Sequence, residues 1–282
     1  MKTRNIRRLF TLLTAALLAL AVCGTARAED YSAANMRLLH YEGEVEILDA
    51  SGNPRFIMEN ARFASGEAMR TGPQSSASVS LDATKILTLD ADSRVGFFQQ
   101  GGAMVLKLEK GALFLDVQEQ LGENETLDIQ TSNMTVGIRG TIVYVRSESI
   151  EDEIGPGLMT TLGVLEGTAQ MSWTDDRGRQ QAAPVPAGNK AVVIDRIKEA
   201  SAAPAQAAEV SPLEAEDVEG FVRELVTGDE QLFQRVTENN AYLIGADENW
   251  TWDGAVTLVA QSASKLYDGK ALTRPGDRKS VV

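Results

Sequence analysis

The side chains that could do chemistry in this sequence are mostly carboxylates, because its 282 residues include 40 Asp and Glu but a single His and a single Cys. A glycoside hydrolase needs two carboxylates held about 5 to 9.5 Å apart across a cleft. Among so many acidic residues some pair meets this condition by chance, so the carboxylates do not indicate catalysis. We predict no catalytic residue.

Two acidic runs, Asp90 with Asp92 and Asp175 with Asp176, offer the clustered oxygen ligands that Ca²⁺ prefers. Neither run has the spacing of a calcium-binding loop, and aspartates are common in turns. We interpret both pairs as solvated turn residues and predict no metal site.

The single His and the single Cys argue against several familiar enzyme sites. His40 is interpreted as a surface or strand-edge residue, and Cys23 lies in a segment that we expect to be removed. No zinc site of His and Cys, no Cys-His pair and no Ser-His-Asp triad can then be assembled. We predict that the protein is not an enzyme and uses no cofactor.

Three tryptophans, Trp173, Trp250 and Trp252, could form a platform for sugars or peptides. Trp173 shares the inward register of its strand with Ala169 and Met171, so we expect it in the core. The other two remain open as binding residues.

Strands must position these side chains, because apolar and polar residues alternate along most of the chain. Lys110-Gly111 and Asp175 to Gly178 predict turns between such strands. About 13 to 15 short strands, with turn residues every 8 to 12 positions or so, indicate an all-β body. We expect elongated, stacked and twisted antiparallel sheets, either solenoid-like or a sandwich, followed by a short helical segment.

The most distinctive turn is a corner bracketed by two glycines, Gly137-Ile138-Arg139-Gly140, between strands at 126–130 and 141–146. The glycines predict positive φ or a close approach to a neighbouring strand. Arg139 either belongs to a ligand or partner surface or ties the corner to a carbonyl or a carboxylate through its five donors. We favour the structural role.

Three motifs, in order along the chain, carry a resemblance to the FecR-type domain. They are the strand GALFLDV at 111–117, Arg-Gly-Thr at 139–141 and Val-Leu-Glu-Gly at 164–167. The resemblance extends over residues 42–195, and its motifs are structural rather than catalytic. The residues that it marks as the structural motif are Gly111, Phe114, Gly137, Arg139, Gly140, Thr141, Glu166 and Gly167.

The resemblance also implies a role in signalling. Family members that regulate transcription join this β domain, through a membrane helix, to a cytoplasmic segment that controls a sigma factor. The sequence given contains neither segment.

The N-terminus predicts export. Basic residues precede the apolar run 9–22, and Ala26-Arg27-Ala28 has the pattern of a cleavage site, so residues 1–28 are interpreted as a signal peptide cleaved after Ala28. A lipoprotein signal ending at Cys23 is the alternative. We expect the mature protein to be secreted, on the cell surface or in the periplasm.

Beyond the β domain, assigned to residues 29–196, the Ala- and Pro-rich residues 197–210 predict a linker. Ser211 to Glu214 has the N-cap, N1 proline and N3 glutamate of a capping box, and Asp229 is the expected cap of a second helix. We expect this helical segment, residues 211–240, to pack on the β body or on itself, with partner binding as the alternative.

Residues 241–276 predict the start of a further β module. The octamer at 266–273 (LYDGKALT) is similar to the opening of Ig-like repeats in large bacterial surface proteins. The last six residues, 277–282, back-translate into the start of a common sequencing adapter. We therefore expect this tail to be foreign and the chain to be a truncated fragment.

The net negative charge of the chain argues against anionic partners. With the five basic residues of the signal and the three charged residues of the tail removed, residues 29–276 hold 20 Lys and Arg against 39 Asp and Glu. So acidic a surface repels phosphate backbones and anionic headgroups. We expect no nucleic-acid partner and no direct membrane insertion of the mature fragment.

Two functional hypotheses follow. The leading one is an exported, non-enzymatic binding or assembly module of the FecR-domain type in a cell-surface or secreted protein, with an unknown protein or cell-envelope partner. The alternative is an extracytoplasmic sensor domain of a signalling protein whose anchor and output lie outside this chain.

Overall fold

The computed structural model describes residues 36–58, 60–196, 206–243 and 250, all within one compact unit. The predicted signal peptide at 1–28, the foreign tail at 277–282, Trp252 and nearly all of the further β module predicted at 241–276 lie outside these residues. Within the described residues no helix is long and apolar enough to cross a bilayer.

Strands dominate the described residues, as the all-β prediction expects. The earlier ones are β1 (Arg37–Glu42), β2 (Val45–Leu48), β3 (Pro54–Arg55), β4 (Ala68–Thr71), β5 (Ser76–Ser80), β6 (Lys85–Leu89), β7 (Arg94–Gln100) and β8 (Ala103–Val117). The later ones are β9 (Thr126–Gln130), β10 (Thr135–Ile138), β11 (Ile142–Asp152), β12 (Gly155–Glu166), β13 (Thr168–Thr174), β14 (Gln180–Pro186), β15 (Asn189–Arg196) and β16 (Gln206–Pro212).

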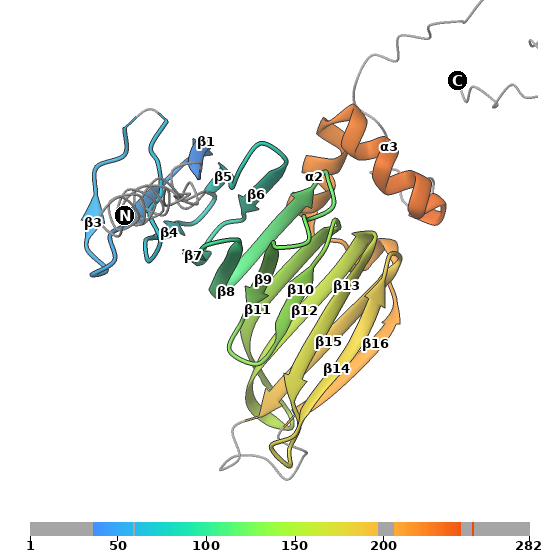
Figure 1. Cartoon of the computed structure of the whole chain (residues 1–282). Helices are drawn as coiled ribbons and strands as arrows, with labels where there is room; N and C mark the ends of the chain where they lie inside the picture. The colour runs from blue at the N-terminus through green and yellow to red at the C-terminus, as the bar shows by residue number, and fades with distance from the viewer. Residues whose placement is uncertain (1–35, 59, 197–205, 244–249, 251–282) are drawn as a thin grey trace, which may run out of the picture. The chain divides into compact units, whose positions relative to one another are not determined.

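Backbone hydrogen bonds connect the strands into one network, which we describe as two sheets that share β8. Sheet I has the antiparallel order β1-β5-β6-β8-β11-β12-β15-β16. Sheet II has the order β3-β2-β4-β7-β8-β9-β10-β13-β14, in which β8 and β9 are parallel and the other pairs antiparallel. In Figure 1, β8 lies between the N-terminal strands and the longer strands that follow.

Strand β8 serves both sheets because its pairing with β7 shifts register between Leu108 and Lys110, directly before Gly111. The turn predicted at Lys110-Gly111 is wrong, since β8 continues through it, but Gly111 has φ of 84°. An added Cβ there would lie 2.5 Å from Ser93 Cα, so only glycine fits. The register change moves the core-facing side chains from even to odd positions, namely Met104, Leu106 and Leu108 before it and Leu113, Leu115 and Val117 after it.

One apolar core contains side chains from both sheets, so the sheets face each other. Leu106 and Ile129 of sheet II and Leu113 and Val143 of sheet I are fully buried in it. Strand lengths range from 2 residues in β3 to 15 in β8, and no regular repeat is apparent. The strands therefore form one large open sheet, continuous through β8, whose two parts share this core.

Strand β16 corrects the predicted linker. Residues 206–212 pair with β15 along their whole length, so the linker assigned to 197–210 is wrong from Gln206 onward. Residues 197–205 lie outside the described part of the chain. The sequence of this edge strand, QAAEVSP, lacks a clear alternation of apolar and polar residues. Its pairing with β15 depends on backbone groups, which every residue has, so no strand is apparent from the sequence.

Two short helices follow β16: α2 (Gly220–Gly228) and α3 (Glu230–Asn239), with 3-10 turns at Ala215–Asp217 and Ala241–Leu243. The capping box predicted at Ser211 is wrong, because Ser211 pairs with Lys190 in the sheet. The first turn begins instead after Glu214, whose backbone N–H donates to Asp217 Oδ2 at 2.8 Å.

The cap predicted for the second helix is confirmed. Asp229 Oδ1 accepts a hydrogen bond of 2.8 Å from the backbone N–H of Leu232. An aspartate at this position satisfies one of the free N–H groups of the first turn, and its charge is favourable there.

Candidate functional site

Five of the predicted motif residues lie at two places on sheet I, whereas Gly137 belongs to β10 of sheet II. Gly111 makes the bend of β8, whereas Gly140, Thr141, Glu166 and Gly167 meet where β11 begins and β12 ends. A Cβ on Gly167 would lie 2.6 Å from the carbonyl oxygen of Gly140, which shows how closely the two backbones approach. This part of the motif is a junction between neighbouring strands.

The two glycines of the corner differ. Gly140 has φ of 104°, as predicted, and an added Cβ would lie 3.1 Å from Gln120 Cα. Gly137 belongs to β10 and is not among the residues with positive φ, and its Cβ would make an ordinary contact of 3.5 Å with Asp128. The prediction of positive φ or close approach is therefore wrong for Gly137, because the strand continues through it.

Arg139 does not have the structural role that we favoured. Its side chain is exposed, and among the described residues it makes no hydrogen bond or ion pair. Arg146 and Arg235, which the sequence analysis did not single out, make the ties expected of Arg139. Nothing in the local sequence distinguishes them, because each binds carboxylates that are far away along the chain.

The outer face of sheet I is covered by a helical cap, which we define as residues 213–243 with Trp250. Its apolar side chains form a second core with residues of β8, β11 and β12; the cluster is Phe114, Ile142, Tyr144, Leu165, Leu213, Val218, Val222, Val226, Leu232, Val236, Leu243 and Trp250. The motif residue Phe114 is therefore buried beneath the cap. The predicted packing of the helical segment on the β body is found.

Tyr144 joins the two sides of this second core. Its hydroxyl donates a hydrogen bond of 2.7 Å to the carbonyl oxygen of Asp217. Burial raises the pKa of Tyr144 above its ordinary value, and the charges of Glu219 and Asp217 raise it further. The tyrosine therefore stays protonated and keeps its role as a donor.

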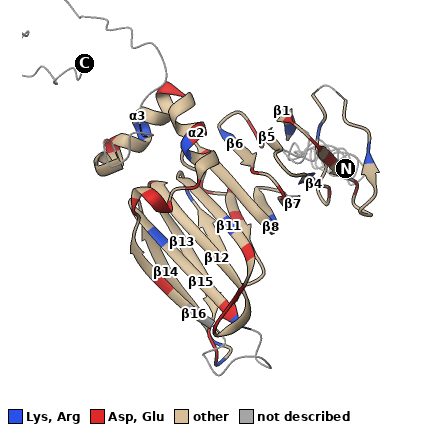
Figure 2. Ribbon diagram, turned by 180° about the vertical axis from the view of Figure 1, so that it is seen from behind, with Lys and Arg blue, Asp and Glu red and all other residues tan. Residues whose placement is uncertain are grey.

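Ion pairs surround the apolar contact. Arg146 on β11 donates to Glu219 Oε2 at 2.7 Å and to Asp90 Oδ2 at 3.1 Å, and Lys190 on β15 pairs with Asp217. The hydrogen bond that Arg146 donates to Glu219 is the main cause of the raised pKa of Arg146. Figure 2 shows charged residues of both signs on the helices and on the strands.

Arg235 on α3 completes the attachment. Its Nη1 donates to Asp116 Oδ1 and its Nε to Glu166 Oε2, both at 2.8 Å. Glu166 thereby connects the strand junction of the motif to the cap. A planar guanidinium that bonds two carboxylates at once holds α3 in one orientation.

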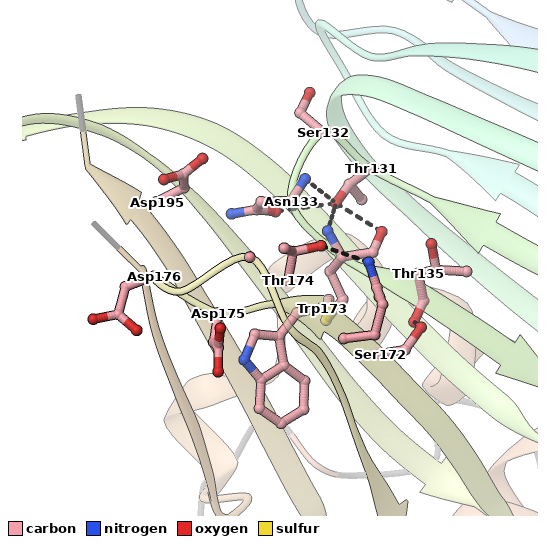
Figure 3. Close-up of a pocket in the computed structure, with 13 residues that line it drawn as sticks. Thr131, Ser132, Asn133, Thr135, Ser172, Trp173, Thr174, Asp175, Asp176 and Asp195 are labelled. Carbon is pink, nitrogen blue, oxygen red and sulfur yellow. Dashed lines mark hydrogen bonds between the residues drawn. The ribbon is translucent and has the colours of Figure 1, made fainter. Parts of the chain in front are cut away.

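A second region has a different character. A polar hollow of about 450 Å³ is formed by the β9–β10 turn, the tip of the β13–β14 hairpin and the end of β15. We call it the polar hollow (Figure 3). The close-up shows Asp175, Asp176 and Asp195 on one side, Thr135 and Ser172 on the other, and Trp173 between them.

Asn133 anchors the β9–β10 turn that forms one wall of the hollow. Its Nδ2 donates to the carbonyl oxygens of Leu158 and Val193 at 3.2 and 3.1 Å, and its Oδ1 accepts from Thr160 at 2.6 Å. These bonds fasten a turn of sheet II to β12 and β15 of sheet I. This wall is therefore rigid.

Asp175 anchors the opposite wall. Its carboxylate accepts from the backbone N–H groups of Arg177 and Arg179, from the Arg179 side chain at 2.9 Å and from Gln181. The hydrogen bond from the Arg179 backbone is the largest of the contributions that hold the pKa of Asp175 well below its usual value. The carboxylate is ionised and fully used within the hairpin tip.

Two of the three tryptophans lie within the described residues, and Trp173 packs against the core as its strand register predicts. Trp173 is only half buried: it packs against the core and also lines the polar hollow. Trp250, which the sequence left open as a binding residue, is buried in the helical cap. Trp252 lies outside the described residues.

The candidate calcium ligands behave as turn residues. Asp90 is paired with Arg146, and Asp92 has φ of 54° in its turn. No group of three or more His, Cys, Asp or Glu in the described part of the chain is arranged to hold a metal ion. His40 is exposed on the edge strand β1, where its Nε2 lies 3.3 Å from Glu42 Oε1, as a strand-edge residue would.

The sequence of part of this chain matches a known protein family. Residues 67–170 match the model described as FecR protein. Residues 67–170 form a FecR-type domain. The matched range includes all eight motif residues, the bend of β8 and the β9–β10 turn of the hollow, whereas the helical cap and β14 to β16 lie beyond it. No curated protein matches the chain.

Two crystal structures of a proposed anti-sigma factor from Parabacteroides distasonis are similar to part of the chain. Each is 12% identical in sequence, and the TM-scores are 0.39 and 0.42. The similar regions cover 51% and 56% of this chain and 60% and 63% of theirs, so the chain spans less than two thirds of those structures.

Proposed function

We propose that this chain is the exported, non-enzymatic sensing module of a signalling protein, and that it binds a protein partner outside the cytoplasm. The observation that carries the proposal is the FecR domain at residues 67–170. The predicted signal peptide at 1–28 supports the location, and the surplus of acidic residues argues against nucleic acid and anionic membrane surfaces as ligands.

The polar hollow is the proposed contact site. Its walls are fixed by Asn133 and Asp175, so the side chains between them are held in place before a ligand arrives. The carboxylate of Asp175 is unsuited to general acid catalysis, because its lowered pKa keeps it ionised near neutral pH. These features support recognition rather than turnover.

A second candidate function is a binding or assembly module at the head of a cell-surface protein. The octamer at 266–273, similar to the opening of Ig-like repeats, favours it. The complete gene separates the two: Ig-like repeats downstream support the surface protein, and a membrane helix with a cytosolic region supports the sensor.

Site-specific photo-crosslinking in the host organism tests the sensing module. A photoreactive amino acid replaces Ser132, which lines the polar hollow, or Glu119, an exposed residue that does not line it. We expect the Ser132 position to give a discrete adduct with one cell-envelope protein, formed outside the cytoplasmic membrane, and the Glu119 position to give none. Adducts with cytoplasmic proteins alone, or none from either position, would contradict the proposal.

A further inference from the structure

We propose that the polar hollow binds a cationic organic group, the amine or guanidinium of a basic side chain on the partner. The inference rests on the proposed function, because it names the chemistry by which that site recognises its partner. Four observations carry it: the charge of the lining, its free hydrogen-bonding groups, the exposed face of Trp173 and the rigidity of the walls.

The charged residues of the lining are all acidic. Asp175, Asp176 and Asp195 line the hollow, and no Lys or Arg does. Arg179 neutralises Asp175 within the hairpin tip. Asp176 and Asp195 are exposed and make no ion pair or side-chain hydrogen bond with the rest of the described chain. Two carboxylates are therefore left without a counter-charge.

Several of the other polar groups are already in use. Asn133 is bonded on both sides of its amide, Ser172 donates to the Thr135 carbonyl at 3.4 Å and Thr174 accepts from Gln180 at 2.7 Å. The two carboxylates accept hydrogen bonds and cannot donate them when ionised, and the hydroxyls of Ser132 and Thr135, which also line the hollow, can donate or accept. A ligand that donates to these carboxylates fits them best, and an ammonium or guanidinium donates while also supplying the missing charge.

Trp173 supplies the third component. One part of its indole packs against the core while another lines the hollow, so the ring is held in a fixed position beside the carboxylates. A cation over the face of a tryptophan is attracted by the ring electrons, and the attraction strengthens when water is partly excluded. An aromatic ring beside unpaired carboxylates suits the apolar stem and charged end of Lys or Arg.

The acidic surface as a whole assists the encounter. The chain carries a formal net charge of −13, so a basic segment is drawn towards it before specific contacts form. This general attraction must be separated from recognition at the hollow, and the experiment therefore needs a control with the same change in net charge.

Calorimetric titration of the full chain with a capped tetralysine peptide tests the inference, and the same peptide with all four amines acetylated is the uncharged probe. The site variant is Asp176→Asn with Asp195→Asn. The matched control is Glu119→Gln with Glu123→Gln, two exposed carboxylates outside the hollow. Far-UV circular dichroism and a thermal melt verify that both variants fold.

We expect tetralysine to bind the natural chain, the site variant to lose about tenfold in affinity and the control to change less than about twofold. A Trp173→Leu variant should also bind more weakly. The inference is overturned if tetralysine does not bind, if both double variants lose affinity equally, or if the acetylated peptide binds as well as the charged one, which would indicate a neutral polar ligand. The photo-crosslinking at Ser132 does not depend on the titration. A Ser132 adduct without tetralysine binding would contradict this inference alone and would leave the proposed sensing module intact.

Discussion

The helical cap and the polar hollow use the same kinds of residue in opposite ways. Beneath the cap, Arg146, Lys190 and Arg235 each face a carboxylate, and an apolar cluster fills the space between them. At the hollow, Asp176 and Asp195 face no cation within the described residues. The comparison shows acidic residues paired where the helical cap is attached, and two of them without a cation from the described part of the chain at the hollow, which is the proposed contact site.

The largest expected effect comes from removing an apolar side chain beneath the helical cap. Replacing Tyr144 by Ala removes a fully buried ring and should lower the free energy of unfolding by about 3 to 5 kcal/mol, measured by urea titration. Tyr144→Phe keeps the ring and loses only the bond to the Asp217 carbonyl, so it should cost about 1 kcal/mol. Equal losses in the two variants would mean that the cap is not packed on this ring.

Two glycines provide the next test, because one lies at the junction under the cap and the other on the strand that leads to the hollow. Gly140→Val should lower the free energy of unfolding by about 1 to 3 kcal/mol, since valine is strained at φ of 104°. Gly137→Ala should change it by less than about 1 kcal/mol, because φ is ordinary there and the added Cβ has room. A stable Gly140→Val protein, seen by thermal melting, would refute the strained corner.

Two arginines, one with ion pairs among the described residues and one without, test how much paired charge contributes to stability. Arg235→Met removes the bonds to Asp116 and Glu166 and should cost about 1 kcal/mol of unfolding free energy, less in high salt. Arg139→Met should cost almost nothing, since the side chain is exposed and makes no ion pair with any described residue. The reverse order in urea unfolding would restore the structural role predicted for Arg139.

The smallest effect is a dependence on pH at the hairpin tip. Asp175 has a folded-state pKa below its unfolded value, so its stabilising contribution is complete above the unfolded pKa near 3.8 and is lost as the pH falls towards the folded value. Unfolding measured across this acid range should therefore show a slope that Asp175→Asn reduces.

Much of the fold was predictable from local patterns. Alternation of apolar and polar residues predicts the strands, and the cap at Asp229 follows from residue type and position. The bend at Gly111 was predicted as a turn, because a glycine after a lysine between two strands has the same local pattern whether the chain reverses or only shifts its register. Strand β16 was missed for a related reason, since its pairing depends on backbone groups that every residue shares.

The candidate site was far less predictable. Trp173 has the strand register of a core residue, and only the position of the neighbouring hairpin leaves part of its ring open to the hollow. Trp250 was left as a possible binding residue and is buried, because the cap folds back over sheet I. Residues that meet through contacts between distant segments carry no signal in a single sequence.

The sequence by itself determined an acidic, strand-rich chain with a FecR-type motif and the residue types suited to each turn, because these depend on composition and on neighbours along the chain. The tertiary structure decided which charges are paired. Arg146 and Arg235 find carboxylates dozens of positions away, while Asp176 and Asp195 find none among the described residues. Electrostatic interaction falls with distance in space and not with separation in sequence, so only the folded chain shows which carboxylates remain free for a ligand.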